Sequence, residues 1–232
     1  LSNIIAITNE IFGEENRLGI ISRLMKSGSN KGRFFSPNID YVLVFAKNIQ
    51  IIDEFRLPLE QEYIDKNYIE IQKEGPLKGE KYCVKGLYQA SLEIRPNQRY
   101  WIQCPDGSFV IPPGKTYPEK INDAEKIKPV TGDGVWRWSY ERYLKESHEG
   151  NFVFKKTKTS SLVDQNKTKS IWNVYTKIWL KNRLEEGRVP TDLITKFENR
   201  HSHAELKKLN IPFDYAKPSE LISYLISFIN SN

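Results

Sequence analysis

The run Tyr41-Val42-Leu43-Val44-Phe45-Ala46 is continuously apolar and rich in β-branched and aromatic side chains. Such a run predicts a strand that is buried on both faces, because a half-exposed strand alternates apolar with polar residues. Strands with two buried faces are typical of α/β sheets that are covered on both sides. The run therefore predicts that the N-terminal region is part of a larger α/β sheet.

One segment before this strand predicts a helix, and a later segment predicts a hairpin. Leu1 to Phe12 has apolar residues at helical spacing, and Gly13 is expected to end that helix. Pro105-Asp106-Gly107 is a strong turn sequence between Arg99 to Cys104 and Ser108 to Ile111. Helices and antiparallel strands in one chain indicate the α+β class.

A second helix and a short strand are predicted after the hairpin. Ser139 is a good N-cap for a helix from Tyr140 to Glu149, and Gly150 stands where a left-handed C-terminal residue belongs. Phe152-Val153-Phe154 then predicts a strand that leads into a lysine-rich segment. The middle of the chain is therefore expected to form a small α+β module.

The C-terminal region predicts two further helices. The pattern Ser202-x-x-Glu205 matches a capping box and predicts the start of a short helix through Leu209. Pro218 is typical of the first turn of the last helix. The apolar face of that helix needs a partner surface and consists of Leu221, Ile222, Leu225, Ile226 and Ile229.

The net charge of +6 is concentrated in one part of the chain. The segment from Asn151 to Pro190 contains nine basic and three acidic residues, so the rest of the chain is neutral. A local excess of this kind is expected of a surface that neutralises phosphates, although a solvated lysine-rich loop would have the same composition. The basic residues are Lys155, Lys156, Lys158, Lys167, Lys169, Lys177, Lys181, Arg183 and Arg188.

Other patterns argue against several classes of protein. No apolar run is long enough to cross a bilayer, and no secretory signal is recognisable, so we expect no membrane partner. Cys83 and Cys104 are too far apart for a redox or zinc motif, which favours reduced thiols in a cytoplasmic protein. His201 and His203 lack a third ligand in a recognised pattern, so they favour a helix start over a metal site.

Several local patterns occur in an order that is similar to the middle of a DNA adenine methyltransferase. The resemblance is to the β-class modification subunit of type III restriction-modification systems, and it covers most of the chain. Each pattern is weak alone, and the shared order makes the match specific. The patterns are Phe34 to Asn48, Arg95-Pro96-Asn97 with Arg99-Tyr100, Pro105-Asp106-Gly107, Trp136-Arg137-Trp138-Ser139, and Phe213 to Lys217-Pro218 with Leu221-Ile222.

This resemblance implies a division into three regions. Residues 1–55 would end the first half of a Rossmann-like catalytic domain, residues 56–200 would be the DNA target recognition domain, and residues 201–232 would start the second catalytic half. The fold class is thus an α+β recognition module flanked by pieces of an α/β methyltransferase sheet. Ala216 replaces the family's usual proline, His203-Ala204 replaces a turn of small residues, and Lys169 to Leu180 departs from the family's usual run.

The resemblance also implies partners and site residues. The intact enzyme would methylate the exocyclic amino group of adenine in double-stranded DNA, as a homodimer with a restriction subunit. S-adenosylmethionine would be its cofactor, held in part by Phe213, Lys217 and Pro218. The basic segment and the family landmarks supply the candidate DNA-binding residues, although the landmarks favour structural or phosphate-directed roles. The candidates are Lys155, Lys156, Lys158, Lys167, Lys169, Arg95, Asn97, Arg99 and Arg137.

Two further groups of residues bear on recognition. Target reading is expected in the segments between the landmarks, Tyr117 to Asp133 and Thr157 to Trp179. Aromatic rings can stack on an extruded base, but large aromatics more often pack in a core, so about one of the five tryptophans is expected to touch DNA. The tryptophans are Trp101, Trp136, Trp138, Trp172 and Trp179.

The catalytic tetrapeptide of the family, (Asp/Asn/Ser)-Pro-Pro-(Tyr/Phe/Trp), is missing. Ile111-Pro112-Pro113-Gly114 has neither the residue before the prolines nor the aromatic after them, and the Phe-x-Gly cofactor loop is also missing. We therefore expect no catalytic residue here and a recognition fragment that is inactive without the rest of its enzyme. The alternative is a stand-alone DNA-binding or specificity protein.

Overall fold

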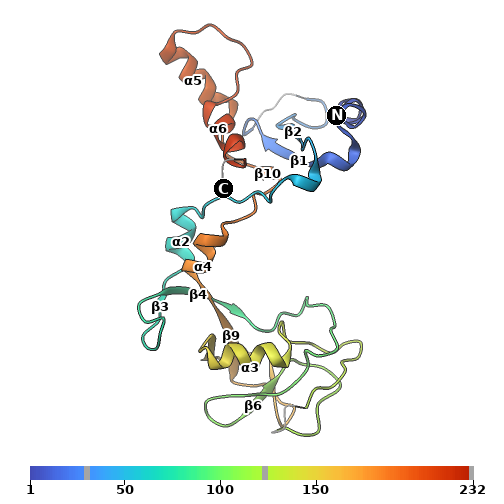
Figure 1. Ribbon diagram of the computed structural model, residues 1–232, viewed down its shortest axis with the longest axis vertical. Coiled ribbons are helices and arrows are strands. Elements are labelled where there is room, and N and C mark those ends of the chain that lie inside the picture. The colour runs from blue at the N-terminus through green and yellow to red at the C-terminus, as the bar shows by residue number, and fades with distance from the viewer. Residues whose placement is uncertain (29–31, 122–124, 230–232) are drawn as a thin grey trace. The chain divides into compact units, whose positions relative to one another are not determined.

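A computed structural model describes residues 1–28, 32–121 and 125–229, and the chain divides into two compact units (Figure 1). The terminal unit combines Leu1–Leu59 with Glu186–Asn232, and the central unit is Glu60–Glu185. Both helices and sheets are present, which confirms the α+β class. Residues 186–200, grouped with the central region in the sequence analysis, fold with the terminal unit.

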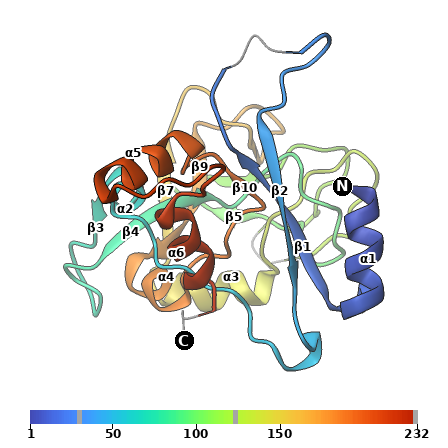
Figure 2. The same cartoon turned by 90° about the horizontal axis from the view of Figure 1, so that it is seen from above.

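The terminal unit is built around the antiparallel strands β1 and β2. Helix α1 (Ser2–Phe12) lies beside this pair in Figure 2, and the ring of Phe12 is 5.4 Å from that of Phe45. The short strand β10 runs parallel to β1 on its other side. The remaining bounds are β1 (Arg17–Leu24), β2 (Ile39–Phe45), β10 (Leu193–Ile194), and the 3-10 turns η1 (Glu14–Asn16) and η2 (Ile49–Ile51).

Strand β2 differs from the expectation of a strand buried on both faces. Tyr41 is 49% exposed, Ile39 is also exposed, and Ala46 is buried just beyond the strand's end. The strand is at an edge of its sheet, with β1 as its neighbour among the described residues. The prediction of two-sided burial is wrong here because apolar composition alone does not determine how many layers cover a strand.

The C-terminal helices are α5 (Asn199–Leu209) and α6 (Ser219–Ser227), and α5 begins before the position that the capping-box pattern predicts. Ser202 is buried inside α5, and its hydroxyl donates to the carbonyl of Ala216 at 2.9 Å. The carboxylate of Glu205 instead accepts hydrogen bonds from the backbone and hydroxyl of Ser219. The predicted start of α5 is wrong because Ser202 and Glu205 bond to the segment that leads into α6.

The apolar face of α6 is partly covered. Leu221 and Phe228 are buried in a cluster with Ile21, Leu57 and Ile194, so this face does pack on the sheet of its own unit. Pro218 is the N-cap of the helix, one position before its first turn. Part of the same face is exposed, namely Ile222, Ile226 and Ile229.

The central unit contains two antiparallel sheets, ordered β3-β4-β9-β7 and β5-β6-β8. The first is made of β3 (Glu70–Ile71), β4 (Lys81–Gly86), β9 (Trp172–Trp179) and β7 (Phe152–Lys156), and the second of β5 (Ile102–Gln103), β6 (Phe109–Ile111) and β8 (Val163–Asp164). Its helices are α2 (Gln61–Asn67), α3 (Tyr140–His148) and α4 (Leu180–Glu186).

The local predictions for the central unit are confirmed. Strands β5 and β6 form the expected hairpin, whose turn contains Gly107 with φ +84°. The Ser139 hydroxyl oxygen accepts a hydrogen bond from the backbone of Arg142 and caps α3, and Gly150 follows that helix with φ +71°. Strand β7 starts at Phe152 as predicted. These elements enclose a core in which Tyr100, Trp136 and Leu87 are fully buried.

Candidate nucleic-acid interface

The most basic part of the chain folds as an ordered loop between β7 and β9, which also contains β8. The carboxylate of Asp164 accepts hydrogen bonds from the backbone of Asn166 (3.0 Å) and of Thr168 (2.9 Å). It also accepts from the Thr168 hydroxyl at 2.9 Å. These bonds close a turn in which Lys167 has φ +62°, so the lysine is carried at a defined place on the surface.

The first half of the loop is held by hydroxyl groups. The buried Ser160 hydroxyl contacts the carbonyl of Trp172 at 2.7 Å and accepts a hydrogen bond from the backbone of Leu162 at 3.0 Å. The Thr157 hydroxyl oxygen accepts from the backbone of Thr159 at 3.1 Å. Small polar side chains therefore organise the backbone, while the lysines between them remain exposed.

Four of the predicted DNA-binding lysines are exposed on this loop and its flanks, and we call them the outer lysines. Among the residues that the structure describes, none of them forms an ion pair with a carboxylate. Their charges therefore remain available to a polyanion. The outer lysines are Lys156, Lys158, Lys167 and Lys169.

Other lysines of the same unit are already engaged. Lys155, also a predicted DNA-binding residue, lies 3.3 Å from the carboxylate of Glu70. Lys177 donates to the side chain of Gln72 at 2.8 Å and to the carbonyl of Gly150 at 2.7 Å, and burial lowers the pKa of its ammonium group. The structure thus divides the basic segment into internally bonded lysines and the outer lysines.

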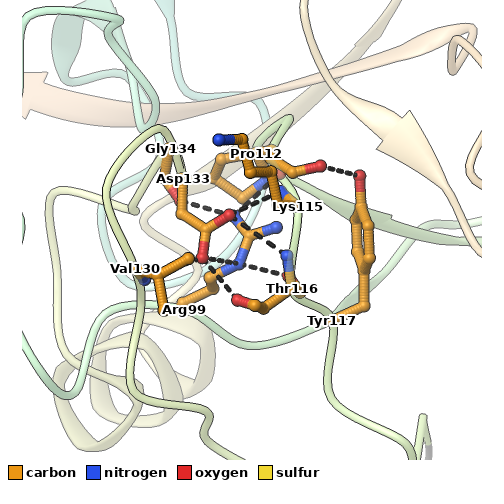
Figure 3. A network of polar contacts seen from close by, with 9 residues as sticks. Arg99, Pro112, Lys115, Thr116, Tyr117, Val130, Asp133 and Gly134 are labelled. Carbon is orange, nitrogen blue, oxygen red and sulfur yellow. Dashed lines mark hydrogen bonds and ion pairs between the residues drawn. The ribbon is translucent and has the colours of Figure 1, made fainter.

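Arg99 was a candidate DNA contact, and its position contradicts that role. Its side chain is completely buried, and Figure 3 shows it enclosed by Pro112, Thr116 and Gly134. The guanidinium donates to the three corresponding carbonyl oxygens at 3.0, 2.7 and 2.6 Å respectively. A residue with no exposed surface cannot touch a phosphate, so Arg99 has the structural role that the sequence analysis favoured for the landmarks.

Asp133 is the partner of Arg99 and the centre of the same network (Figure 3). Its Oδ2 lies 3.7 Å from Arg99 Nε, and its carboxylate accepts from the backbone of Lys115 (2.5 Å) and of Val130 (2.9 Å) and from the Thr116 hydroxyl. Burial raises the pKa of Asp133, but these hydrogen bonds outweigh burial and lower the pKa to about 2. A Cβ at Gly114 would stand 2.4 Å from Asp133 Oδ1, so the network leaves no room for a larger residue there.

The remaining landmark residues divide by exposure. Arg95 and Asn97 are exposed and can reach a ligand. Arg137 is partly buried, one of its terminal nitrogens is enclosed, and burial lowers the pKa of its guanidinium. Of the three, Arg95 and Asn97 are accessible as candidate DNA contacts.

The tryptophans belong to the core of the central unit, as the sequence analysis favoured. None of the five is more than 9% exposed. The indole N–H groups of Trp136, Trp101 and Trp179 donate to Tyr100 O (2.8 Å), Pro118 O (3.1 Å) and Asn151 Oδ1 (2.9 Å). Buried indoles that are bonded in this way are not free to stack on an extruded base.

The expected reading segments are only partly loops. Strand β9 forms the last eight residues of Thr157 to Trp179 and pairs on both sides, with β4 and β7, so this part of the segment is sheet and not a loop. Residues 157–171 remain a surface segment. Of Tyr117 to Asp133, residues 122–124 lie outside the described residues, and Asp133 itself is buried.

The residues predicted to contact S-adenosylmethionine do not present a common surface. Phe213 is 64% exposed, whereas Pro218 is buried at the start of α6. The ammonium of Lys217 lies 3.2 Å from Asp40, which also accepts a 2.7 Å hydrogen bond from buried Arg23. These side chains alone do not make a pocket for the cofactor.

The other side chains with metal-binding or redox chemistry are isolated. His201 and His203 are exposed on α5, and the described residues contain no group of histidine, cysteine and acidic side chains suited to a metal ion. Cys83 and Cys104 are both free thiols, and burial raises the pKa of Cys104 to about 12.

Comparison with known proteins assigns no family. No protein-family model matches this chain, and no curated protein matches it. Within the described ranges, no helix is long and apolar enough to cross a membrane.

Two carboxylates that hold the backbone near this surface were not singled out as site residues, namely Asp133 and Asp164. The Asp164-Gln165-Asn166-Lys167-Thr168 sequence does contain a local signal, since aspartate commonly bonds to backbone amides a few residues ahead. Asp133 has no such signal, because its partners come from two separate segments.

Proposed function

We propose that the central unit binds double-stranded DNA as the target recognition domain of an adenine-specific DNA methyltransferase, similar to those of type III restriction-modification systems. The order of local motifs along the chain supports the family, and the basic surface supports the partner. The observation that carries the proposal is the set of outer lysines on an ordered loop. They are exposed and have no carboxylate partner among the described residues.

Duplex DNA is the polyanion that this arrangement suits. Phosphate contacts from lysines position a protein on the duplex without reading its sequence, whereas side chains at base edges provide specificity. Arg95 and Asn97 are exposed, and their side chains suit base edges. Arginine can form two hydrogen bonds with guanine, and asparagine can form two with adenine. The outer lysines therefore supply affinity in this proposal, and exposed residues outside the buried network supply specificity.

In the intact enzyme, the terminal unit would contribute to a Rossmann-like catalytic domain that uses S-adenosylmethionine. Apolar residues of the terminal unit support a contact with further protein, because Ile4, Ile7 and Ile11 recur on helix α1 and all are exposed. A homodimer, a restriction subunit and a cytoplasmic location belong to the same proposal and follow from the family resemblance.

A stand-alone DNA-binding protein is the second candidate. It is favoured by the terminal unit's own buried cluster, which joins Ile21, Leu57 and Leu221. Both candidates use the same DNA interface and differ in whether a catalytic partner exists.

The experiment is equilibrium binding of a fluorescent duplex by the complete chain at fixed salt. Alanine at all four outer lysines is expected to weaken binding to unrelated sequences equally. A matched control removes the same charge from exposed lysines elsewhere in the central unit, namely Lys66, Lys73, Lys78 and Lys145. Equal losses in the two variants would show that the interface is not at the outer lysines.

A further inference from the structure

Two of the outer lysines are held in place by aromatic rings. Lys156 Nζ lies 5.1 Å from the centre of the Trp172 ring, and Lys167 Nζ lies 5.2 Å from the centre of the Tyr117 ring. A ring attracts an ammonium group through its quadrupole but carries no net charge. A lysine positioned in this way keeps its full charge for a phosphate.

Lysines positioned by carboxylates do not have this property. Lys155 also lies over a ring, that of Tyr175, but its charge is compensated by Glu70 at 3.3 Å. Lys126 is paired with Glu141 in the same unit. The combination of a fixed ammonium and an uncompensated charge therefore distinguishes Lys156 and Lys167 from these paired lysines.

The ring beneath Lys156 is itself fixed by the hairpin turn. Trp172 is buried, and its indole N–H donates to Asp106 Oδ2 at 2.8 Å. Asp106 also accepts from the backbone and hydroxyl of Ser108, at 3.1 and 2.6 Å. The turn between β5 and β6 thus holds the Trp172 ring at the end of the sheet where Lys156 lies.

The ring that holds Lys167 is fixed by the buried network of Figure 3. The Tyr117 hydroxyl donates to the carbonyl of Gly114 at 2.7 Å, and the ring stacks on Trp101 at 6.0 Å. The Arg99 guanidinium lies 5.1 Å from the centre of the same ring. Arg99, which cannot touch DNA, is therefore connected to an exposed lysine through Tyr117.

We propose that Trp172 and Tyr117 are positioning residues of the DNA interface, each holding one lysine where its ammonium contacts a backbone phosphate. This inference rests on the proposed function, since it takes the outer lysines as phosphate contacts. A pre-positioned side chain loses less conformational freedom on binding than a free one. Lys156 and Lys167 consequently contribute more to affinity than Lys158 and Lys169, which have no ring contact among the described residues.

The test is a double-mutant cycle on Tyr117 and Lys167, measured as affinity for a fluorescent duplex at fixed salt. Tyr117→Leu removes the ring and is expected to weaken binding about 2- to 5-fold, the usual strength of an exposed cation–π contact. Tyr117→Phe keeps the ring and its stacking on Trp101 but loses the hydrogen bond to Gly114, so it is expected to weaken binding less than Tyr117→Leu does. In a Lys167→Ala background, Tyr117→Leu is expected to cause no further loss.

A lysine comparison keeps the inference testable if Tyr117→Leu fails to fold, which thermal unfolding would show. Lys167→Ala and Lys169→Ala remove the same charge two residues apart, and the first is expected to weaken binding about 2- to 5-fold more than the second. Equal losses of affinity in Lys167→Ala and Lys169→Ala would overturn the inference. Additive losses of Tyr117→Leu and Lys167→Ala in the double-mutant cycle would also overturn it. If the unchanged chain does not bind the duplex, the proposed function itself fails.

Discussion

Arg99 and Asp133 are buried residues that support the proposed interface without being exposed. A buried ion pair is costly to desolvate, and it is stable only when further hydrogen bonds satisfy both partners. Asp133 meets this condition through the backbone groups of Lys115 and Val130. Arg99 meets it in part, since its Nε and Nη1 donate to three carbonyl oxygens while its buried Nη2 has no hydrogen bond among the described residues. The pair therefore joins separate segments of the central unit and fixes the place of Tyr117.

The first prediction concerns Asp133→Asn, which leaves the buried Arg99 charge without its partner. We expect a loss of about 3 kcal/mol in the free energy of unfolding near neutral pH. The pKa of Asp133 is lowered from 3.8 to about 2, so its carboxylate stabilises the fold above about pH 4 and loses that effect as the pH falls through about 2. The difference in free energy of unfolding between the unchanged chain and Asp133→Asn should therefore become smaller as the pH falls from about 4 to about 2, as measured by denaturant titrations. If this difference stayed constant over the same pH range, the ionised Asp133 carboxylate would not be the source of the stabilisation.

At the scale of elements, the central unit follows its local sequence signals closely. The turn at Gly107, the N-cap Ser139 and strand β7 were predictable because each depends on residues near one another in the chain. The start of α5 and the burial of Arg99 were not predictable, because Ser202 bonds to Ala216 and Arg99 to Asp133 across longer distances in sequence. The basic segment could be located from composition, but its division into paired and outer lysines depends on tertiary contacts.

The second prediction tests the turn that carries Lys167. Asp164→Ala removes the acceptor of three hydrogen bonds, so the backbone amides of Asn166 and Thr168 should exchange with solvent faster. Asp164→Asn keeps an oxygen acceptor and is the matched control. Hydrogen exchange followed by NMR gives the measurement. Unchanged protection in Asp164→Ala would mean that the turn is held by other contacts.

The third prediction concerns the division between framework and reader. Transfer of residues 157–171 with residues 117–130 into an intact methyltransferase of the proposed family should change the DNA site that it methylates. Strand β9 stays with the recipient, because it pairs with two neighbours and forms framework. Single-molecule sequencing of genomic DNA would identify the modified site. Methylation confined to the recipient's own site would place recognition outside these segments.

At the scale of the whole molecule, the two units have different roles in the proposal. The central unit presents the outer lysines and has a core of its own, which includes Tyr100 and Trp136. The terminal unit has a smaller buried cluster and exposed apolar side chains on α1 and α6. This contrast supports DNA binding by the central unit and a protein contact by the terminal unit.

The fourth prediction is that this chain, by itself, transfers no methyl group to DNA. The catalytic tetrapeptide of the proposed family is missing from the sequence, and Phe213, Lys217 and Pro218, which were expected to contact the cofactor, do not present one surface. Incubation with labelled S-adenosylmethionine and duplex DNA should leave the DNA unlabelled, and calorimetry should detect at best very weak binding of the cofactor. Incorporation of label would contradict the account of this chain as a recognition fragment.

The salt dependence of duplex binding tests the central claim most directly. Each lysine–phosphate contact contributes about −0.9 to the slope of log affinity against log salt concentration, so contacts from the outer lysines predict a slope near −3.6. Alanine at Lys156, Lys158, Lys167 and Lys169 should bring the slope close to zero, whereas the matched lysine control should leave it unchanged. A slope that stays near its original value in the outer-lysine variant would contradict the proposed interface.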